Sequence, residues 1–166
     1  MLFVSSEELR AVDGRSLDAL LARTEMTVAA GAAEIQGLAA AALLFADYAV
    51  LDIGAALHLD AAEGWAAAAW RLGHGALRLH IEGRTVFSAS EAKNAGLCDE
   101  IIEGDAAEWL QRWMDGRSAV ALDSAAMLIR ARGGDALERA EFARLFATGE
   151  PQRGLSAFLN RRSPKT

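Results

Sequence analysis

The stretch from Gly83 to Ile102 constrains the fold of this chain more than any other part of the sequence. Ser88 stands where a helix N-cap is expected, and Glu91 three residues later completes the Ser-x-x-Glu pattern of a capping box. Gly96 follows a run of good helix formers and suits the left-handed position just after a helix. The residues from Leu97 to Ile102 are expected to form an extended segment that leaves the helix. The stretch therefore predicts a short helix with both ends marked, followed by a strand.

Strands and helices of ordinary length are expected along the rest of the chain. Short apolar runs predict strands at 28–30, 48–51 and 55–59. Apolar residues on every face predict a buried helix at 37–46, and helical spacing predicts helices at 65–81 with a break at Gly73 and Gly75, then at 106–114, 119–132, 136–148 and 154–160. Asp135, with Glu138 three residues on, is expected to cap the helix at 136–148. We therefore expect a single domain over 1–166, with an α/β core at 1–105 and a helical region at 106–166.

Composition narrows the class of protein. The 166 residues are 52% hydrophobic and 24% charged, which is typical of a globular domain. The formal net charge of −6 argues against a nucleic-acid-binding surface, and one cysteine excludes an intrachain disulfide framework. The apolar run from Val28 to Ala46 approaches the length of a membrane span, but its many Ala and Gly residues, together with Glu34 and Gln36, favour buried elements of a core. No membrane is expected as a partner, and the cytoplasm is the expected compartment.

The organising stretch also resembles a known family. Gly-Arg, a hydrophobic pair, Ser-Ala-x-Glu-Ala, Gly-Leu, an acidic pair and two isoleucines are similar to the late signature of the crotonase (enoyl-CoA hydratase/isomerase) superfamily. The segments 28–48, 57–64, 138–146 and 154–164 resemble other parts of that family in order and length. The resemblance covers the later part of the family's fold and leaves out its N-terminal strands. It implies a truncated crotonase-like core, a ββα spiral, with a C-terminal helical region.

The resemblance also implies where thioester chemistry would occur. Family members polarise a thioester carbonyl with two backbone N–H groups, because negative charge develops on that oxygen as an enolate forms. The second donor would be the N–H of Leu38, in place of a glycine, and the first would fall near Glu7. One hydratase carboxylate position is occupied by Ala41, and the other falls on Asp60. Glu63, one helical turn further on, is an alternative carboxylate.

Other polar residues have both a functional and a plain interpretation. Arg161, Arg162 and Lys165 form a basic tail that in the family helps to hold the phosphates of coenzyme A, and a solvated chain end explains them equally well. The three histidines, His58, His74 and His80, lack the spacing of metal ligands, so no metal site is predicted. Cys98 is expected to be a small buried hydrophobic residue.

Two kinds of function remain open. The chain is either a non-catalytic crotonase-like protein that binds an acyl-CoA or a partner subunit, or an acyl-CoA isomerase or lyase that uses Asp60 as its one acid/base group. No tightly bound cofactor is expected, and a coenzyme A thioester is the expected ligand. The apolar C-terminal helices predict association with another chain. The resemblance implies that the partner is further copies of this chain, in a trimer or hexamer, or a companion crotonase-like subunit.

Overall fold

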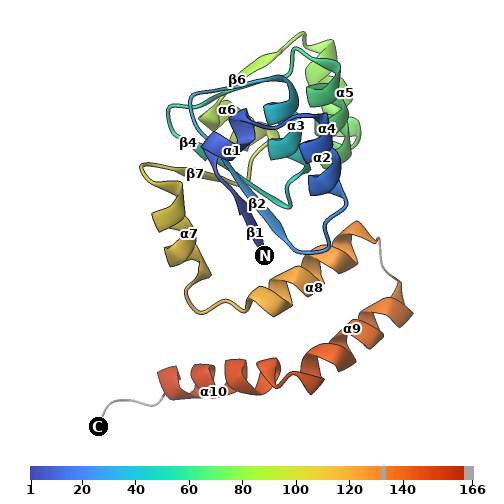
Figure 1. Ribbon diagram of the computed structural model, residues 1–166, viewed down its shortest axis with the longest axis vertical. Helices are drawn as coiled ribbons and strands as arrows, with labels where there is room; N and C mark the ends of the chain where they lie inside the picture. The colour runs from blue at the N-terminus through green and yellow to red at the C-terminus, as the bar shows by residue number, and fades with distance from the viewer. Residues whose placement is uncertain (132–133, 163–166) are drawn as a thin grey trace.

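The centre of the computed structural model, which describes residues 1–131 and 134–162, is a parallel sheet of four strands (Figure 1). The strands lie side by side in the order β1 (Leu2–Val4), β2 (Thr27–Gly31), β4 (Tyr48–Asp52) and β7 (Glu100–Ile102). Every neighbouring pair is parallel, and Val28 in β2 is level with Phe3 on one side and Tyr48 on the other. Such sheets are stable when helices cover both faces.

Helices do cover both faces, and all five residues of β2 are consequently buried. On one face Ala29 packs with the core residues of α3 (Gly37–Phe45). On the other face Val28 and Ala30 pack with residues of α7 (Ala106–Met114) and α8 (Ala119–Arg130). The alternation of the two sets follows from the two-residue period of a strand.

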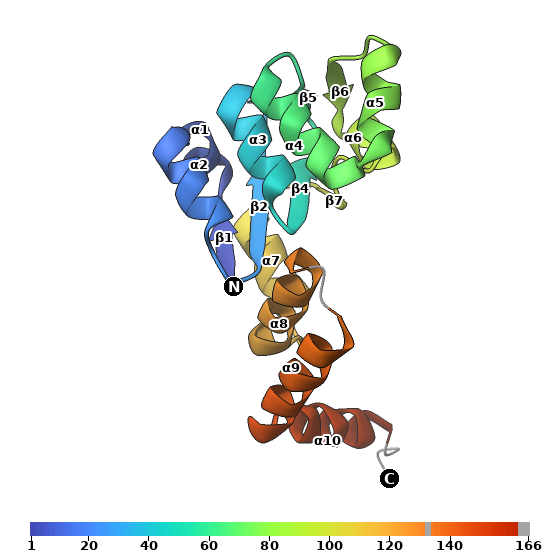
Figure 2. The same cartoon turned by 90° about the vertical axis from the view of Figure 1, so that its right-hand side faces the viewer.

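The innermost helix is α3, as its uniformly apolar sequence predicted. Residues Ala40 to Leu44 have no exposed surface. Along its sides α3 contacts α4 (Ala62–Leu72), α1 (Ser6–Arg10) and α2 (Gly14–Leu21), and Figure 2 shows α3 and α4 lying side by side.

A second, smaller sheet lies beside the start of α3. It has the order β3 (Glu34–Ile35), β5 (Ala56–His58) and β6 (Val86–Ser88). The β3–β5 pair is parallel and the β5–β6 pair is antiparallel. Ile35, Leu57 and Phe87 point into the core and are buried, so the residues that alternate with them form the outer face of this sheet.

The helix predicted in the organising stretch is α6 (Ala89–Ala95), and both of its expected end signals are confirmed. The Ser88 side chain accepts from the Glu91 N–H while the Glu91 carboxylate accepts from the Ser88 N–H. Gly96 is left-handed, with φ of 80°. The predicted helix break at Gly73 separates α4 from α5 (His74–Ile81). The strands β1, β3 and β6 were not predicted.

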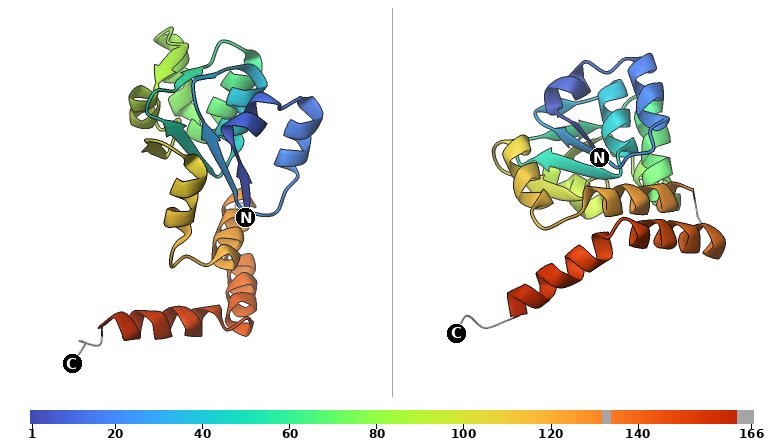
Figure 3. Two further views of the ribbon diagram at one scale, coloured as in Figure 1. Left: turned by 60° about the vertical axis from the view of Figure 1, so that its left-hand side comes forward. Right: turned by 60° about the horizontal axis from the view of Figure 1, so that its bottom comes forward.

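The C-terminal region is helical as predicted, and it ends in α9 (Asp135–Ala147) and α10 (Glu150–Arg162). The predicted cap of α9 is wrong by one residue: Gly134 is the N-cap, and Asp135 lies in the first turn. Figure 3 shows α9 and α10 extending away from the sheets. Large apolar side chains stand exposed along these two helices: Phe142, Phe146, Leu155, Phe158 and Leu159.

The apolar run that resembled a membrane span forms β2, β3 and α3 instead. Among the described residues, no helix has the length and apolar character needed to cross a bilayer.

Candidate functional site

The candidate site lies where the parallel strands β3 and β5 end at the same edge. Ile35 is level with Leu57, so the segments that follow these residues leave the sheet together. The first segment leads to Leu38 at the start of α3, and the second leads through Asp60 to the start of α4. The structure therefore brings Leu38 and Asp60, which are far apart in the sequence, to neighbouring elements.

Two helix N-termini meet at this edge without a side-chain cap. The N-cap residues of α3 and α4 are Gln36 and Ala61, and neither side chain accepts a hydrogen bond from its helix. Side chains cap α1, α2, α6, α7 and α8, whereas α5 and α9 also begin without a side-chain cap. Gly37 has a φ of +57°, a conformation that glycine adopts without strain. The first N–H groups of α3, including that of Leu38, have no acceptor within the helix and can donate to an oxygen outside it.

The residues matched to the family's carboxylates differ sharply in environment. Ala41 has no exposed surface, so its position faces the core and offers no place for a carboxylate in contact with a ligand. Asp60, two residues after the end of β5, is exposed, and Glu63 is exposed in the first turn of α4. Within the described residues neither carboxylate makes a hydrogen bond or an ion pair. Both are consequently free to meet a ligand or a proton.

The place expected for the first N–H donor is strongly acidic. Glu7 lies exposed in the first turn of α1, which packs beside α3. The next residue, Glu8, accepts a hydrogen bond from the Ser5 N–H at 2.8 Å, and this bond, followed by the one from the Ser5 hydroxyl, lowers the pKa of Glu8. An ionised carboxylate here opposes the development of negative charge nearby.

A histidine–carboxylate pair stands on the outer face of the small sheet, and sequence reasoning missed it. Glu34 in β3 and His58 in β5 are in direct contact through Oε2 and Nε2. The sequence contains part of the signal, because apolar and polar residues alternate from Leu57 to Asp60. Both leucines are buried in the structure. Alternation places His58 and Asp60 on one face, but it does not reveal that Glu34 comes from the adjacent strand.

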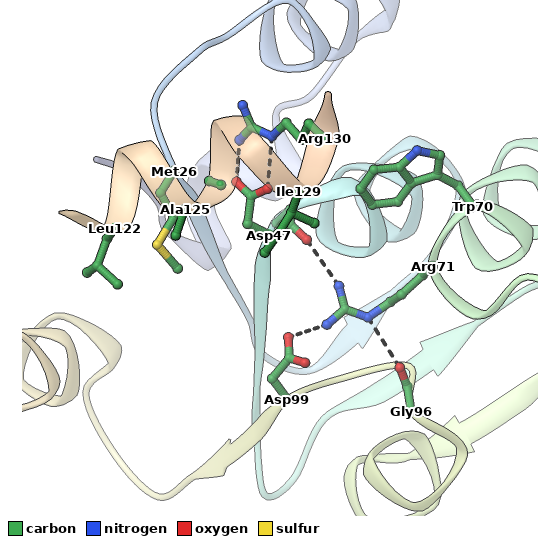
Figure 4. Close-up of a pocket in the computed structure, with 12 residues that line it drawn as sticks. Met26, Asp47, Trp70, Arg71, Gly96, Asp99, Leu122, Ala125, Ile129 and Arg130 are labelled. Atoms are coloured by element: carbon green, nitrogen blue, oxygen red, sulfur yellow. Dashed lines mark hydrogen bonds and ion pairs between the residues drawn. The ribbon is translucent and has the colours of Figure 1, made fainter. Parts of the chain in front are cut away.

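A cavity of about 520 Å³ opens at the opposite end of α3, and its polar groups are already satisfied (Figure 4). Arg71 donates to the carbonyl oxygens of Ala46 and Gly96 and pairs with Asp99. Across the cavity Arg130 of α8 makes a two-point contact with Asp47. These arginines join helices to the core, and sequence reasoning missed both because their partners are 28 and 83 residues away.

The described part of the predicted basic tail does not lie at the candidate site within one chain. Arg161 and Arg162 are the last residues of α10, which lies far from α3 in Figures 1 and 2. Lys165 falls outside the described residues. The described histidines, cysteine and acidic residues form no cluster that would hold a metal ion.

Comparison with known proteins identifies the fold. No protein-family model and no curated protein matches the sequence. Among solved structures, a putative enoyl-CoA hydratase/isomerase family protein from Hyphomonas neptunium is 25% identical, with a TM-score of 0.69 over 89% of this chain and 63% of that one. DspI from Pseudomonas aeruginosa is 25% identical, with a TM-score of 0.68 over 97% of this chain and 67% of that one.

A further neighbour is an enoyl-CoA hydratase/carnithine racemase from Magnetospirillum magneticum, with 22% identity and a TM-score of 0.68 over 95% of this chain and 69% of that one. This chain thus spans about two thirds of the length of the structures that it matches. The α/β fold class predicted from the sequence is confirmed.

Proposed function

We propose that this chain, which has the enoyl-CoA hydratase/isomerase (crotonase) fold over about two thirds of that fold's length, binds the thioester carbonyl of an acyl-CoA at the start of α3 without two-carboxylate hydration. The observation that carries this proposal is the contrast between Leu38 and Ala41. The N–H of Leu38 is available at an uncapped helix start, whereas the position matched to a hydratase carboxylate is an alanine buried in the core.

The proposed contact is a hydrogen bond from a backbone N–H to a carbonyl oxygen. A neutral hydrogen bond of this kind contributes about 0.5–1.5 kcal/mol, which corresponds to roughly a 2- to 10-fold change in affinity. The positive end of the α3 dipole adds to it, since α3 begins at the same point. The carboxylates at Glu7 and Asp60 oppose a fully developed oxyanion, which favours binding over hydration.

Calorimetry with acetyl-CoA and free coenzyme A tests the contact. Leu38→Pro removes the N–H at a position in the first helical turn, where a proline costs no helical hydrogen bond. We expect Leu38→Pro to weaken acetyl-CoA binding by about 2- to 10-fold with little effect on coenzyme A. Leu38→Ala is the matched control, because it shortens the side chain and keeps the N–H. Failure of the wild-type protein to bind acetyl-CoA would refute the proposal.

A second candidate is an isomerase or lyase in which Asp60 alone moves the proton. Its support is the exposure of Asp60 and its lack of a hydrogen-bond partner among the described residues. The test is conversion of a 3-enoyl-CoA into its conjugated 2-enoyl isomer, followed by absorbance. Turnover that disappears in Asp60→Asn supports this candidate, and binding without turnover supports the first.

We also propose that the exposed apolar face of α9 and α10 mediates self-association. Phe142 is 62% exposed and its ring lies 4.5 Å from that of Phe146, while Leu155 is 59% exposed. Light scattering after gel filtration tests this: wild type is expected to be a trimer or hexamer, and Phe142→Glu is expected to dissociate it. A monomeric wild type contradicts the proposal.

A further inference from the structure

We propose that a second cavity, at the C-terminal end of α3, binds a small uncharged molecule that is largely apolar and carries one hydrogen-bonding group. The protein group that recognises this molecule is the hydroxyl of Thr27, the first residue of β2. The site lies at the opposite end of α3 from the Leu38 N–H, so it does not depend on the proposed binding of a thioester.

The cavity has a volume of about 200 Å³ and mostly apolar walls. The rings of Phe45 and Trp70 form one part of the wall, with centroids 5.6 Å apart and planes tilted by 59°. A cavity of about 150 Å³ lined by Leu, Ile and Phe is large enough to bind benzene, so this one has room for a six-membered ring and a substituent. The lining residues are Leu20 and Leu21 of α2, Thr27 of β2, Phe45 of α3, Trp70 of α4 and Arg130 of α8.

The hydroxyl of Thr27 is the unsatisfied polar group of this wall. Thr27 is 2% exposed, and its Oγ1 atom has no hydrogen-bond partner. No other buried side-chain nitrogen or oxygen lacks a partner in the part of the chain that the structure describes. Buried polar groups are nearly always hydrogen-bonded, because an unpaired one has lost its water without compensation. A ligand that offers a donor or an acceptor to Oγ1 removes this penalty.

The Thr27 side chain lies on the same side of the large sheet as the cavity. Successive residues of a strand face opposite sides of the sheet. Ala29, two residues along β2, packs in the cluster that contains α3, whereas Val28 packs against α7 and α8. Thr27 therefore shares the α3 side with Ala29. Leu20 and Phe45, which line the cavity, belong to that same cluster.

The charged residue of the described cavity wall, Arg130, is already fully engaged. Its guanidinium makes a two-point contact with Asp47 and donates to the carbonyl oxygens of Arg23 and Glu25 at 2.7 and 2.8 Å. Asp47 also accepts a hydrogen bond from the Thr27 N–H at 2.7 Å. A charged ligand would lose its hydration here without gaining a free counter-ion. The wall therefore favours an uncharged ligand.

Two of the lining residues also reach the surface. The side chains of Leu21 and Trp70 are both about half exposed, so a ligand can enter from solvent between α2 and α4. Trp70 and Arg130 also line the cavity of about 520 Å³, which makes the two cavities neighbours (Figure 4). In the smaller cavity the hydroxyl of Thr27 is the group that distinguishes a polar ligand from an apolar one.

Calorimetric titration with phenol and with toluene tests the site, because the two molecules are similar in shape and only phenol has a hydroxyl. Both are expected to bind the wild-type protein. Thr27→Val replaces the hydroxyl with a methyl group, so the ratio of phenol affinity to toluene affinity is expected to fall about 2- to 10-fold, the usual contribution of one neutral hydrogen bond. Thr24→Val is the matched control, because Thr24 is exposed and does not line the cavity, and its ratio is expected to equal that of wild type.

Urea unfolding without ligand gives a readout of opposite sign. Since Thr27→Val removes an unpaired buried hydroxyl, its urea midpoint is expected to equal or exceed that of wild type. Thr27→Ser keeps the hydroxyl and is expected to keep the wild-type ratio of affinities. The indole N–H signal of Trp70 in nuclear magnetic resonance spectra, assigned with Trp70→Phe, is expected to shift on addition of phenol.

Binding of neither phenol nor toluene by the wild-type protein overturns the inference, as does an affinity ratio in Thr27→Val equal to that of wild type. A lower urea midpoint in Thr27→Val also overturns it, because it would show that the hydroxyl is already hydrogen-bonded in the free protein. Binding of phenol without a shift of the Trp70 signal places the ligand elsewhere and overturns it as well.

Discussion

Replacing Arg71 with leucine is expected to destabilise the fold by about 3 kcal/mol, at the low end of the cost of breaking a buried ion pair. Its guanidinium joins three parts of the chain that are separate in sequence. From α4 it donates to the Ala46 carbonyl at 3.0 Å, just past α3, and to the Gly96 carbonyl at 3.2 Å, just past α6. It also pairs with Asp99, which precedes β7, and its side chain is only 10% exposed.

The magnitude follows from what the substitution leaves behind. A hydrogen bond to a charged group contributes roughly 1.5–3 kcal/mol, and removing one partner of a buried ion pair costs about 3–5 kcal/mol. Asp99 is 34% exposed and still accepts a hydrogen bond from the Ala49 N–H at 2.7 Å, so its orphaned charge is partly compensated. Leucine also fills part of the volume that the arginine stem occupied. These two facts place the loss near the lower bound.

Urea unfolding measures the loss. With a slope of about 2 kcal/mol per molar urea, a 3 kcal/mol loss lowers the midpoint by about 1.5 M at unchanged slope. Arg78→Leu is the matched control on α5: that side chain is 72% exposed and lies 3.9 Å from Glu82, so little change is expected. A loss below about 1 kcal/mol for Arg71→Leu, or an equal loss for Arg78→Leu, would refute the structural role assigned to Arg71.

Four further outcomes follow from α6 and its surroundings. Ser88→Ala removes the α6 cap and is expected to cost about 1 kcal/mol, seen as a fall in Tm of about 2–4 °C by calorimetry. Hydrogen bonds from the backbone N–H and hydroxyl of Ser88, together with Arg84, lower the pKa of Glu91. The contribution of Glu91 to stability is therefore present above its unfolded-state pKa and is lost as the pH falls through its folded-state pKa. Glu91→Gln should flatten the dependence of the urea midpoint on pH in that acid range. Burial raises the pKa of Cys98 to about 11, so a thiol reagent at pH 8 should modify Cys98 only through unfolding. The free energy of unfolding should also fall as the pH rises from the unfolded-state pKa of Cys98 to about 11, and Cys98→Ala should remove this dependence. Gly96→Ala places a side chain at φ of 80° and within 3.1 Å of Leu72, and a loss of about 1–2 kcal/mol in urea unfolding is expected.

Local signals predicted the elements that depend on neighbours in sequence. The α6 capping box needs only Ser88 and Glu91, and Gly96 ends the helix because glycine adopts the left-handed conformation without strain. Both ends could therefore be predicted from the local sequence. Burial of α3 was also readable, since no face of it is polar. Cys98 is 3% exposed, as its expected role as a small hydrophobic residue requires.

Contacts between residues far apart in the sequence could not be predicted from local patterns. The strand β1 is three residues long and is a strand because it pairs with β2, which begins more than twenty residues later. The same limit applies to Glu34 and His58, whose contact depends on the register of β3 and β5. One exposed acidic residue and one histidine, 24 positions apart, carry no local signal of a shared site.

In the candidate site, some features are determined by the backbone and the core, and others depend on exposed side chains. The Leu38 N–H is presented by the backbone at the end of β3, so it persists whatever side chain stands there. At Ala41 the side chain itself is restricted, because it is buried in the apolar surroundings of α3. An ionised carboxylate there would cost several kcal/mol. A carboxylate at that position would therefore require a different core. Of the polar residues near this edge, His58 ends β5, and the exposed Asp60 follows two residues later.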